Sequence, residues 1–341
     1  MSYGNTPTKL DASRKYYDKL WFNHYWNEFV LKNEDKLNYS ILSTNPTITL
    51  DIIKDNPDKP WDWSWLSNNP NITWDFIKDN TDKPWDWFNL SKNPNITWDI
   101  VKGNPDKQWN WFSISYNPNI TWDIVKDNLD KPWNWYYISC NPNITWDIVK
   151  DNPDKPWSWC GMSENPNITW DIIKDNQDKP WSYYLLSYNP TITWDIIKGN
   201  LNKFRNWDGV SQNPNITWDI IKDNPDKQWN WFAISGNPNI IWDIVEENPD
   251  KPWDWKGLSK NPNITWDILS EYNDSVDWQQ CYKLSSNIFT KQKELFLEEQ
   301  YRKHNAAFKI QTYWRRANYN PEYLLCRSRL MHECDMLGIV D

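Results

Sequence analysis

Apolar and polar positions along this chain follow a block of 24 residues, which recurs ten times without insertion or deletion between residues 45 and 270. Each block carries a short apolar stretch around Ile-Thr-Trp-Asp-Ile, a polar stretch rich in Asp, Asn and Lys, and a second, Trp-rich apolar stretch ending in Ser. A strict period gives every unit the same neighbour geometry, which is the condition for a stacked repeat array.

The first apolar stretch of each block predicts a short helix. In residues 70–93, Thr73 is a good N-cap because its hydroxyl can accept a hydrogen bond from a free backbone N–H. Asp75 follows where a negative charge complements the helix dipole. Asn80 is expected to end this helix, since Asn tolerates the left-handed conformation.

The second apolar stretch predicts another helix, which starts near residues 82–84. Pro84 suits a first turn, where its missing N–H is not needed. The helix is expected to run to Ser91 and to stop before Pro94, because the residue before proline avoids helical geometry. A β-solenoid is the competing architecture, but two prolines within many units oppose it.

Degenerate copies of the block flank the regular array. Trp26, Leu42 and Ser43 keep its register one period upstream, and Leu284–Asn287 repeats the Leu-Ser-x-Asn pattern two residues out of step. Atypical terminal units are expected as caps. We therefore predict an all-α fold, an αα-solenoid in which about ten two-helix repeats form a superhelical stack with helical caps at both ends. The predicted regions are an N-terminal tail with a degenerate cap, the solenoid, a C-terminal cap and a basic tail, at residues 1–44, 45–273, 274–305 and 306–341.

The repeat motif carries a resemblance to a known group of proteins. The stretch "NPNITWDIVKDNLDKPWNWYYIS", residues 117–139, resembles the Trp-rich repeat proteins of giant double-stranded DNA viruses of the mimivirus type. The resemblance covers the ten regular copies, and it implies an interaction scaffold comparable to the ankyrin-repeat proteins of those viruses. It supplies no catalytic residue that could be carried over to this chain.

Charge and composition narrow the classes of function. The formal net charge of −9 argues against a nucleic-acid binder, which needs a basic surface. Five cysteines without CxxC spacing favour a reducing compartment. No signal peptide and no apolar run long enough to span a membrane is evident, so we expect the protein in the host cytoplasm or the virion rather than secreted.

Nothing in the sequence predicts an enzyme, because P-loop, GxSxG and HExxH motifs are missing, and no cofactor or metal ligand set is evident. The recurring Asp after each Trp is explained by the helix dipole, and the recurring Trp by the core. Positions that vary between copies are better candidates for a partner surface, since the scaffold can change them and keep its stacking. The candidates are Trp65, Phe88, Tyr116, Tyr136, Tyr137, Tyr184, Tyr188 and Lys256.

The C-terminal tail is basic and has two interpretations. Its segment "AAFKIQTYWRRANYN" resembles an IQ motif, the helix bound by calmodulin-like proteins, although Asn320 stands where that motif usually has a second basic residue. The residues that carry this resemblance are Ile310, Gln311, Arg315 and Arg316. The alternative is a terminal helix that seals the last repeat through Ile310, Tyr313 and Trp314.

The sequence thus favours a non-enzymatic scaffold for protein–protein interaction, with a host protein as the expected partner. Two other classes remain open: a structural component of the virion, and a carbohydrate-binding repeat protein that uses exposed Trp side chains. We expect no nucleic-acid partner.

Overall fold

The computed structural model describes residues 9–272 and 282–319, and within these ranges every regular element is a helix. The chain divides into two compact units, one formed by Tyr25–Phe289 and the other by helix α1 (Lys9–His24) with helix α22 (Thr290–Tyr319). The all-α class and the repeat-like helical array predicted from the sequence are confirmed. The β-solenoid alternative is wrong for the described part of the chain, which contains no strand.

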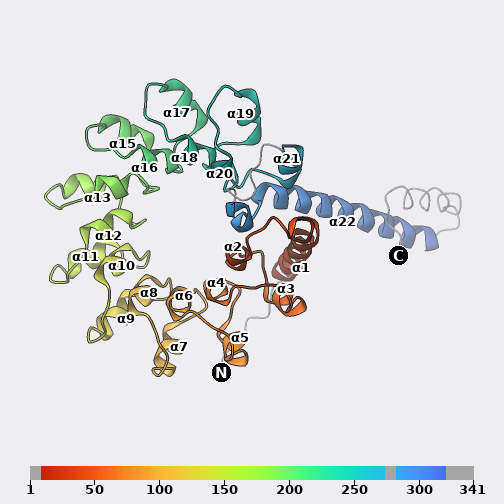
Figure 1. Ribbon diagram of the computed structural model, residues 1–341, viewed down its shortest axis with the longest axis horizontal. Helices are drawn as coiled ribbons and strands as arrows, with labels where there is room; N and C mark the ends of the chain where they lie inside the picture. Colours follow the sequence, from red (N-terminus) through yellow and green to blue (C-terminus); the bar gives the residue numbers. More distant parts are fainter. Residues whose placement is uncertain (1–8, 273–281, 320–341) are drawn as a thin grey trace. The chain divides into compact units, whose positions relative to one another are not determined.

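The Tyr25–Phe289 unit alternates first and second helices, and in Figure 1 the second helices form the inner row and the first helices the outer row. The unit opens with η1 (Tyr25–Val30) and η2 (Leu31–Asn33). The first helices are α3 (Leu50–Asp55), α5 (Trp74–Asp79), α7 (Trp98–Gly103), α9 (Trp122–Asp127), α11 (Trp146–Asp151), α13 (Trp170–Asp175), α15 (Trp194–Gly199), α17 (Trp218–Asp223), α19 (Trp242–Glu247) and α21 (Trp266–Glu271). The second helices are α2 (Tyr39–Ser43), α4 (Trp63–Leu66), α6 (Trp87–Lys92), α8 (Trp111–Tyr116), α10 (Trp135–Cys140), α12 (Trp159–Glu164), α14 (Tyr183–Leu186), α16 (Trp207–Gln212), α18 (Trp231–Ser235), α20 (Trp255–Leu258) and η4 (Tyr282–Ser286).

A threonine hydroxyl caps six of the ten first helices, as predicted. The hydroxyl of Thr73 accepts a hydrogen bond from the N–H of Phe76 at 3.3 Å. Asn80 does end the helix, but the predicted left-handed conformation is wrong, because its φ is −132°. Its side-chain amide instead donates to the carbonyl of Phe76 at 2.9 Å. The amide thus satisfies a carbonyl of the last turn that the helix itself leaves open.

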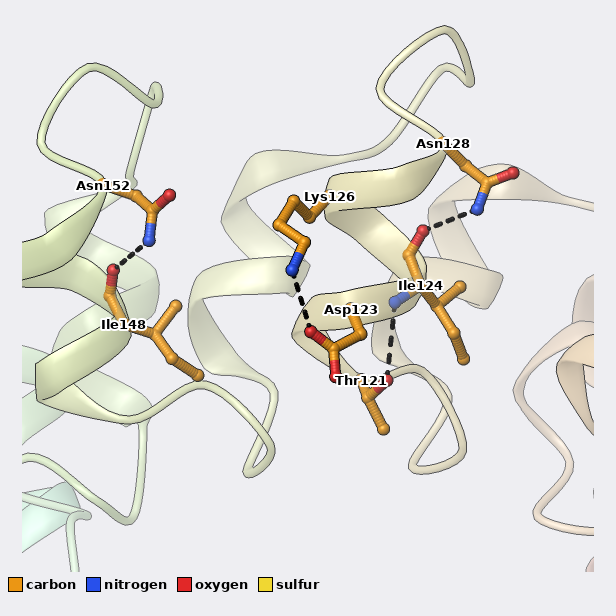
Figure 2. A network of polar contacts seen from close by, with 7 residues as sticks. All are labelled: Thr121, Asp123, Ile124, Lys126, Asn128, Ile148 and Asn152. Carbon is orange, nitrogen blue, oxygen red and sulfur yellow. Dashed lines mark hydrogen bonds and ion pairs between the residues drawn. The ribbon is translucent and has the colours of Figure 1, made fainter.

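The same local network recurs two repeats later (Figure 2). The hydroxyl of Thr121 accepts from the N–H of Ile124 at 3.5 Å, and the amide of Asn128 donates to the carbonyl of Ile124 at 2.8 Å. Lys126 pairs with Asp123 at 3.1 Å across one turn. Short helices of six residues are therefore stabilised at both ends by their own side chains.

The second helices begin later than the sequence suggested. Helix α6 starts at Trp87, and its N-cap is Asp86, whose carboxylate accepts from the N–H of Asn89 at 2.9 Å. The predicted start at residues 82–84 is therefore wrong. Pro84 lies in the connection before the helix, which is held by a hydrogen bond of 2.8 Å from the indole N–H of Trp85 to the carbonyl of Asn80.

Buried asparagines join each unit to the one before it. The side-chain amide of Asn93 is 0% exposed and donates to the carbonyls of Ser67 and Asn69, both at 3.0 Å. Its oxygen accepts from the N–H of Asn95 at 2.9 Å. The equivalent residues form a ladder: Asn45, Asn69, Asn93, Asn117, Asn141, Asn165, Asn189, Asn213, Asn237, Asn261 and Asn287.

The most buried side chains of each unit are aliphatic residues and serines rather than tryptophans. Ile72, Leu90 and Ser91 are 0% exposed, whereas Trp74 and Trp87 keep part of their surface in solvent. The Trp residues stack between neighbouring units, as in the edge-to-face contact of Trp87 and Trp109 with ring centroids 5.0 Å apart. The expectation that the recurring Trp form the core is therefore met only in part.

The first and last units of the Tyr25–Phe289 body contact each other. The amide of Asn287 donates to the carbonyls of Ser259 and Asn261, so the out-of-step copy fills the place of an eleventh ladder residue. The amide of Asn45 in turn donates to the carbonyls of Ser285 at 2.9 Å and Asn287 at 3.1 Å. The ladder therefore closes on itself, where the sequence analysis expected two separate caps on a superhelical stack.

The second compact unit pairs helices α1 and α22. Lys293 forms an ion pair with Asp18 at 2.7 Å, and His24 stacks on Phe296 with ring centroids 4.4 Å apart. Tyr17 also contacts Tyr301, with ring centroids 4.3 Å apart. Because α22 is a single helix from Thr290 to Tyr319, it crosses the domain boundary expected at residues 305 and 306.

Candidate binding surface

The candidate partner residues lie on the second helices of the repeats, except Tyr188, which lies in the turn after α14. Four of them are well exposed: Trp65 at 47%, Phe88 at 43%, Tyr116 at 51% and Tyr184 at 60%. Lys256 is exposed as well, whereas Tyr136, Tyr137 and Tyr188 are half-buried. The variable positions thus follow the inner row of helices in Figure 1, and we call them the variable row. Its three positions per helix are those occupied by Phe88, Asn89 and Lys92 in α6.

Aromatic side chains of the variable row contact each other from helix to helix. Phe88 lies 6.0 Å from Phe112, and Phe112 lies 4.2 Å from Tyr137, measured between ring centroids. Tyr116 contacts Tyr137 at 5.5 Å. Phe112, which the sequence analysis did not select, is 42% exposed, and its position one period after Phe88 could have identified it. Three neighbouring helices therefore present one continuous aromatic strip.

Two hollows occupy equivalent places along this row. The first has a volume of about 400 Å³ and is lined by Glu164, Tyr184, Leu185, Tyr188, Asn189 and Pro190. The second, two periods later, has a volume of about 200 Å³ and is lined chiefly by Gln212, Phe232, Gly236, Asn237, Pro238 and Lys260. The Asn-Pro pair is common to both, whereas the remaining residues differ. The repeat thus places a hollow at equivalent positions of the backbone. The side chains of the variable row determine which chemical groups line each hollow.

The middle position of the variable row, which Asn89 occupies in α6, tolerates fewer residue types than the sequence suggested. At Gly161, which is equivalent to Tyr137, a Cβ atom would meet the carbonyl oxygen of Tyr136 in the preceding unit. The same overlap recurs between Gly257 and the carbonyl oxygen of Phe232. Close contact between neighbouring second helices therefore dictates glycine in some copies, and variation at this position reflects packing as well as recognition.

The carboxylate of Glu164 on helix α12 contacts two side chains of the variable row on helix α10. The hydroxyl of Tyr136 donates to Glu164 at 3.0 Å, and the thiol of Cys140 lies 3.4 Å from the other carboxylate oxygen. Burial and the adjacent Glu164 charge raise the pKa of Cys140 well above its ordinary value. Burial and the hydrogen bond to Glu164 raise the pKa of Tyr136.

Selective alkylation of cysteines checks this arrangement. Since a raised pKa leaves less thiolate at a given pH, iodoacetamide at pH 8 is expected to modify the exposed Cys160 at least about tenfold faster than the buried Cys140. Peptide mapping by mass spectrometry of the native protein measures both rates. The variant Glu164→Ala should accelerate modification of Cys140, because it removes the nearby negative charge. Equal rates at the two cysteines in the native protein would contradict the geometry.

The IQ-like residues belong to the α1–α22 unit. Ile310 is half-buried and Gln311 is exposed on α22, and Tyr313 is 53% exposed. The backbone of Arg315 and Arg316 continues this helix, and their side chains, like that of Trp314, lie outside the described residues. The structure therefore places only the first two of the four IQ-like side chains.

Three further observations concern membrane-spanning helices, metal binding and similarity to known proteins. None of the helices in the described ranges is both long and apolar enough to cross a membrane. Within those ranges no group of three or more His, Cys, Asp or Glu is placed to hold a metal ion. Comparison with known protein families, with curated proteins and with solved structures finds no match to this chain.

Proposed function

We propose that this chain is a non-enzymatic repeat scaffold, an αα-solenoid that binds a protein partner through its variable row. The observation that supports this most is the pair of equivalent hollows with different linings. A fixed backbone with exchangeable side chains is the arrangement by which repeat proteins acquire binding specificity. The invariant residues maintain the array, and the variable ones contact the partner.

The chemistry of the row suits a protein surface. Tyr and Phe offer a large contact area and lose little conformational entropy on binding, because each has only two side-chain torsions. Lys92 lies over the ring of Phe88 at 5.1 Å, and Lys260 lies over the ring of Phe232 at 4.2 Å, so cations accompany the exposed aromatics. The resemblance to giant-virus repeat proteins points to a host protein as the partner.

A triple substitution in the row tests this proposal. Phe88→Ala, Tyr116→Ala and Tyr184→Ala remove three exposed rings whose loss costs the fold little. Affinity capture from infected or host cells with quantitative mass spectrometry identifies the partner bound by the unchanged protein. The purified partner is then titrated against both proteins, and the triple variant should bind at least about a hundredfold more weakly, since each aromatic contact residue contributes about 1–2 kcal/mol.

The matched control changes three exposed apolar residues outside the row, through Leu129→Ala, Leu201→Ala and Ile241→Thr. This control variant should bind the partner within about twofold of the unchanged protein. Equal losses in the two triple variants, or a partner that binds both as tightly as the unchanged protein, would refute a partner surface on the variable row.

A further inference from the structure

A second set of hollows lies between consecutive units, away from the variable row. One, of about 380 Å³, is lined chiefly by Trp74, Lys78, Lys83, Trp85, Trp87 and Lys107. The next, of about 440 Å³, is lined chiefly by Trp98, Lys102, Lys107, Trp109, Trp111 and Lys131. Each residue of the second set stands one period after a residue of the first, and Lys107 lines both. We call these hollows the Trp–Lys pockets.

Stacking of the units accounts for only part of the surface of these tryptophans, although Trp74 and Trp87 each contact Trp109 of the next unit, with ring centroids 5.8 and 5.0 Å apart. Ile72, Leu90 and Asn93, which also lie in the repeat, are 0% exposed. Trp74, Trp85 and Trp87 each keep part of their surface open. Three indoles around a hollow of several hundred Å³ match the size and the aromatic lining of small-ligand sites.

The rim of the pockets is polar but balanced in charge. Lys78 pairs with Asp75 at 2.7 Å, and Lys83 and Lys107 pair with Asp82 and Asp106, each at 3.1 Å. Each ammonium group therefore sits beside a carboxylate, and an anionic or cationic ligand gains little net attraction. An uncharged ligand with many hydroxyl groups can instead accept hydrogen bonds from lysine and donate them to aspartate.

We propose that the Trp–Lys pockets bind the pyranose rings of a neutral, linear polysaccharide. The negative face of an indole attracts the C–H face of a sugar ring, and the paired Lys and Asp side chains contact its hydroxyl groups. The periodicity supports a polymer, because equivalent pockets at two successive junctions present equivalent subsites to a ligand that is itself a repeat. This site uses residues that recur in most copies, and it shares none of them with the variable row.

Several copies depart from this pattern: Leu50 replaces the Trp equivalent to Trp74, Tyr183 the Trp equivalent to Trp87, and Glu246 the Lys equivalent to Lys78. Arg205 stands where the other copies have the Trp equivalent to Trp85, and Phe204 beside it is 0% exposed and contacts Tyr183. The pocket at the Arg205 junction lacks one indole. A long glycan would therefore contact two runs of units with three indoles each, separated by the two consecutive units that carry Tyr183 and Arg205.

Isothermal titration with neutral glucose oligomers tests the proposal on the full chain. The probes are α-1,4-, β-1,3- and β-1,4-linked series, from glucose to the hexasaccharide. At least one series should bind, with an affinity that rises at least about tenfold from monomer to hexamer as further pockets are engaged. The variant Lys83→Ala, Lys107→Ala, Lys131→Ala should weaken the hexasaccharide at least about fivefold, since it removes donors from consecutive pockets.

The control variant Lys92→Ala, Lys256→Ala, Lys260→Ala removes the same charge from the variable row, and it should stay within about twofold of the unchanged protein. Three results would overturn the proposal: no binding of any neutral oligomer at millimolar concentration, equal losses in both variants, or tighter binding of an oligoproline peptide or a sulfated oligosaccharide than of every neutral oligomer. The protein-binding role of the variable row is tested separately, with a protein partner and the aromatic triple variant.

Discussion

Replacing Asn165 with leucine is expected to destabilise the array by about 3 kcal/mol, because it leaves buried polar groups without partners. The side-chain amide of Asn165 donates to the carbonyls of Ser139 at 2.8 Å, Asn141 at 3.1 Å and Ile144 at 3.0 Å. Its oxygen accepts from the N–H of Asn167 at 2.8 Å. Leucine has a similar size but can make none of these four bonds.

Two of the three carbonyls keep another donor after the change. The carbonyl of Asn141 also accepts from the N–H of Ile144, and that of Ile144 also accepts from the amide of Asn167. The carbonyl of Ser139 and the N–H of Asn167 lose the bonds that Asn165 made, and each such loss costs about 1–3 kcal/mol. The expected figure of about 3 kcal/mol is the sum of these two losses at moderate cost.

Urea unfolding followed by circular dichroism measures this effect, and Asn167→Thr is the matched control. Asn167 donates to the carbonyls of Pro142 and Ile144 at the edge of the same junction. Threonine occurs naturally at this position as Thr191, where its hydroxyl donates to the carbonyl of Ile168 at 2.7 Å. The control should lose less than about 1 kcal/mol. An Asn165→Leu variant as stable as the unchanged protein would show that the ladder does not hold the units together.

The local part of the fold could be predicted because it depends on local chemistry. Thr73 caps its helix through a hydroxyl three residues from its target, and such a contact can be inferred from the spacing alone. The role of Asn93 could not be predicted in this way, because an Asn before a proline indicates only the end of the preceding helix. Its amide bonds to carbonyls 24 and 26 residues earlier in the chain, and no local pattern reveals that pairing.

The candidate surface was predicted in outline for a similar reason. Variation between copies correctly identified Phe88 and Tyr184 as exposed side chains. It could not reveal that Gly161 is required by the close approach of the Tyr136 carbonyl oxygen, because that contact depends on the distance between neighbouring helices. The recurrence of Trp in nearly every copy suggested that Trp74 belongs to the core, but its side chain is half-buried. A residue can recur because every junction between units needs it, whether or not it is buried in the core.

Replacing Asn45 with leucine distinguishes a closed array from a stack with two free ends. In a stack with free ends, Asn45 would lie in the first regular unit, near solvent, and its loss would cost little. In the structure it is 1% exposed, and its amide donates to the carbonyls of Ser285 and Asn287 and to the hydroxyl of Tyr25 at 3.2 Å. We therefore expect Asn45→Leu to destabilise the protein by about 3 kcal/mol, as an interior ladder substitution does.

The closing junction depends on Asn45 more than other junctions depend on their ladder residue. Between interior units, residues such as Asn71 add further bonds, in this case to the carbonyls of Pro46 and Ile48. At the equivalent place, Thr47 directs both its N–H and its hydroxyl to the side-chain oxygen of Asn45. Among the described residues, the closing junction thus lacks the bonds that a second asparagine provides elsewhere.

Loss of closure should be visible at the N–H of Asn38, which donates to the hydroxyl of Ser285 at 2.9 Å. Asn45→Leu should remove the hydrogen-exchange protection of this amide and increase the radius of gyration measured by small-angle scattering. Asn165→Leu, which leaves Asn45 in place, should preserve the protection at Asn38 under native conditions. Because the two substitutions remove the same chemistry from different junctions, unchanged protection at Asn38 in the Asn45→Leu variant would mean that the two ends of the array do not hold each other.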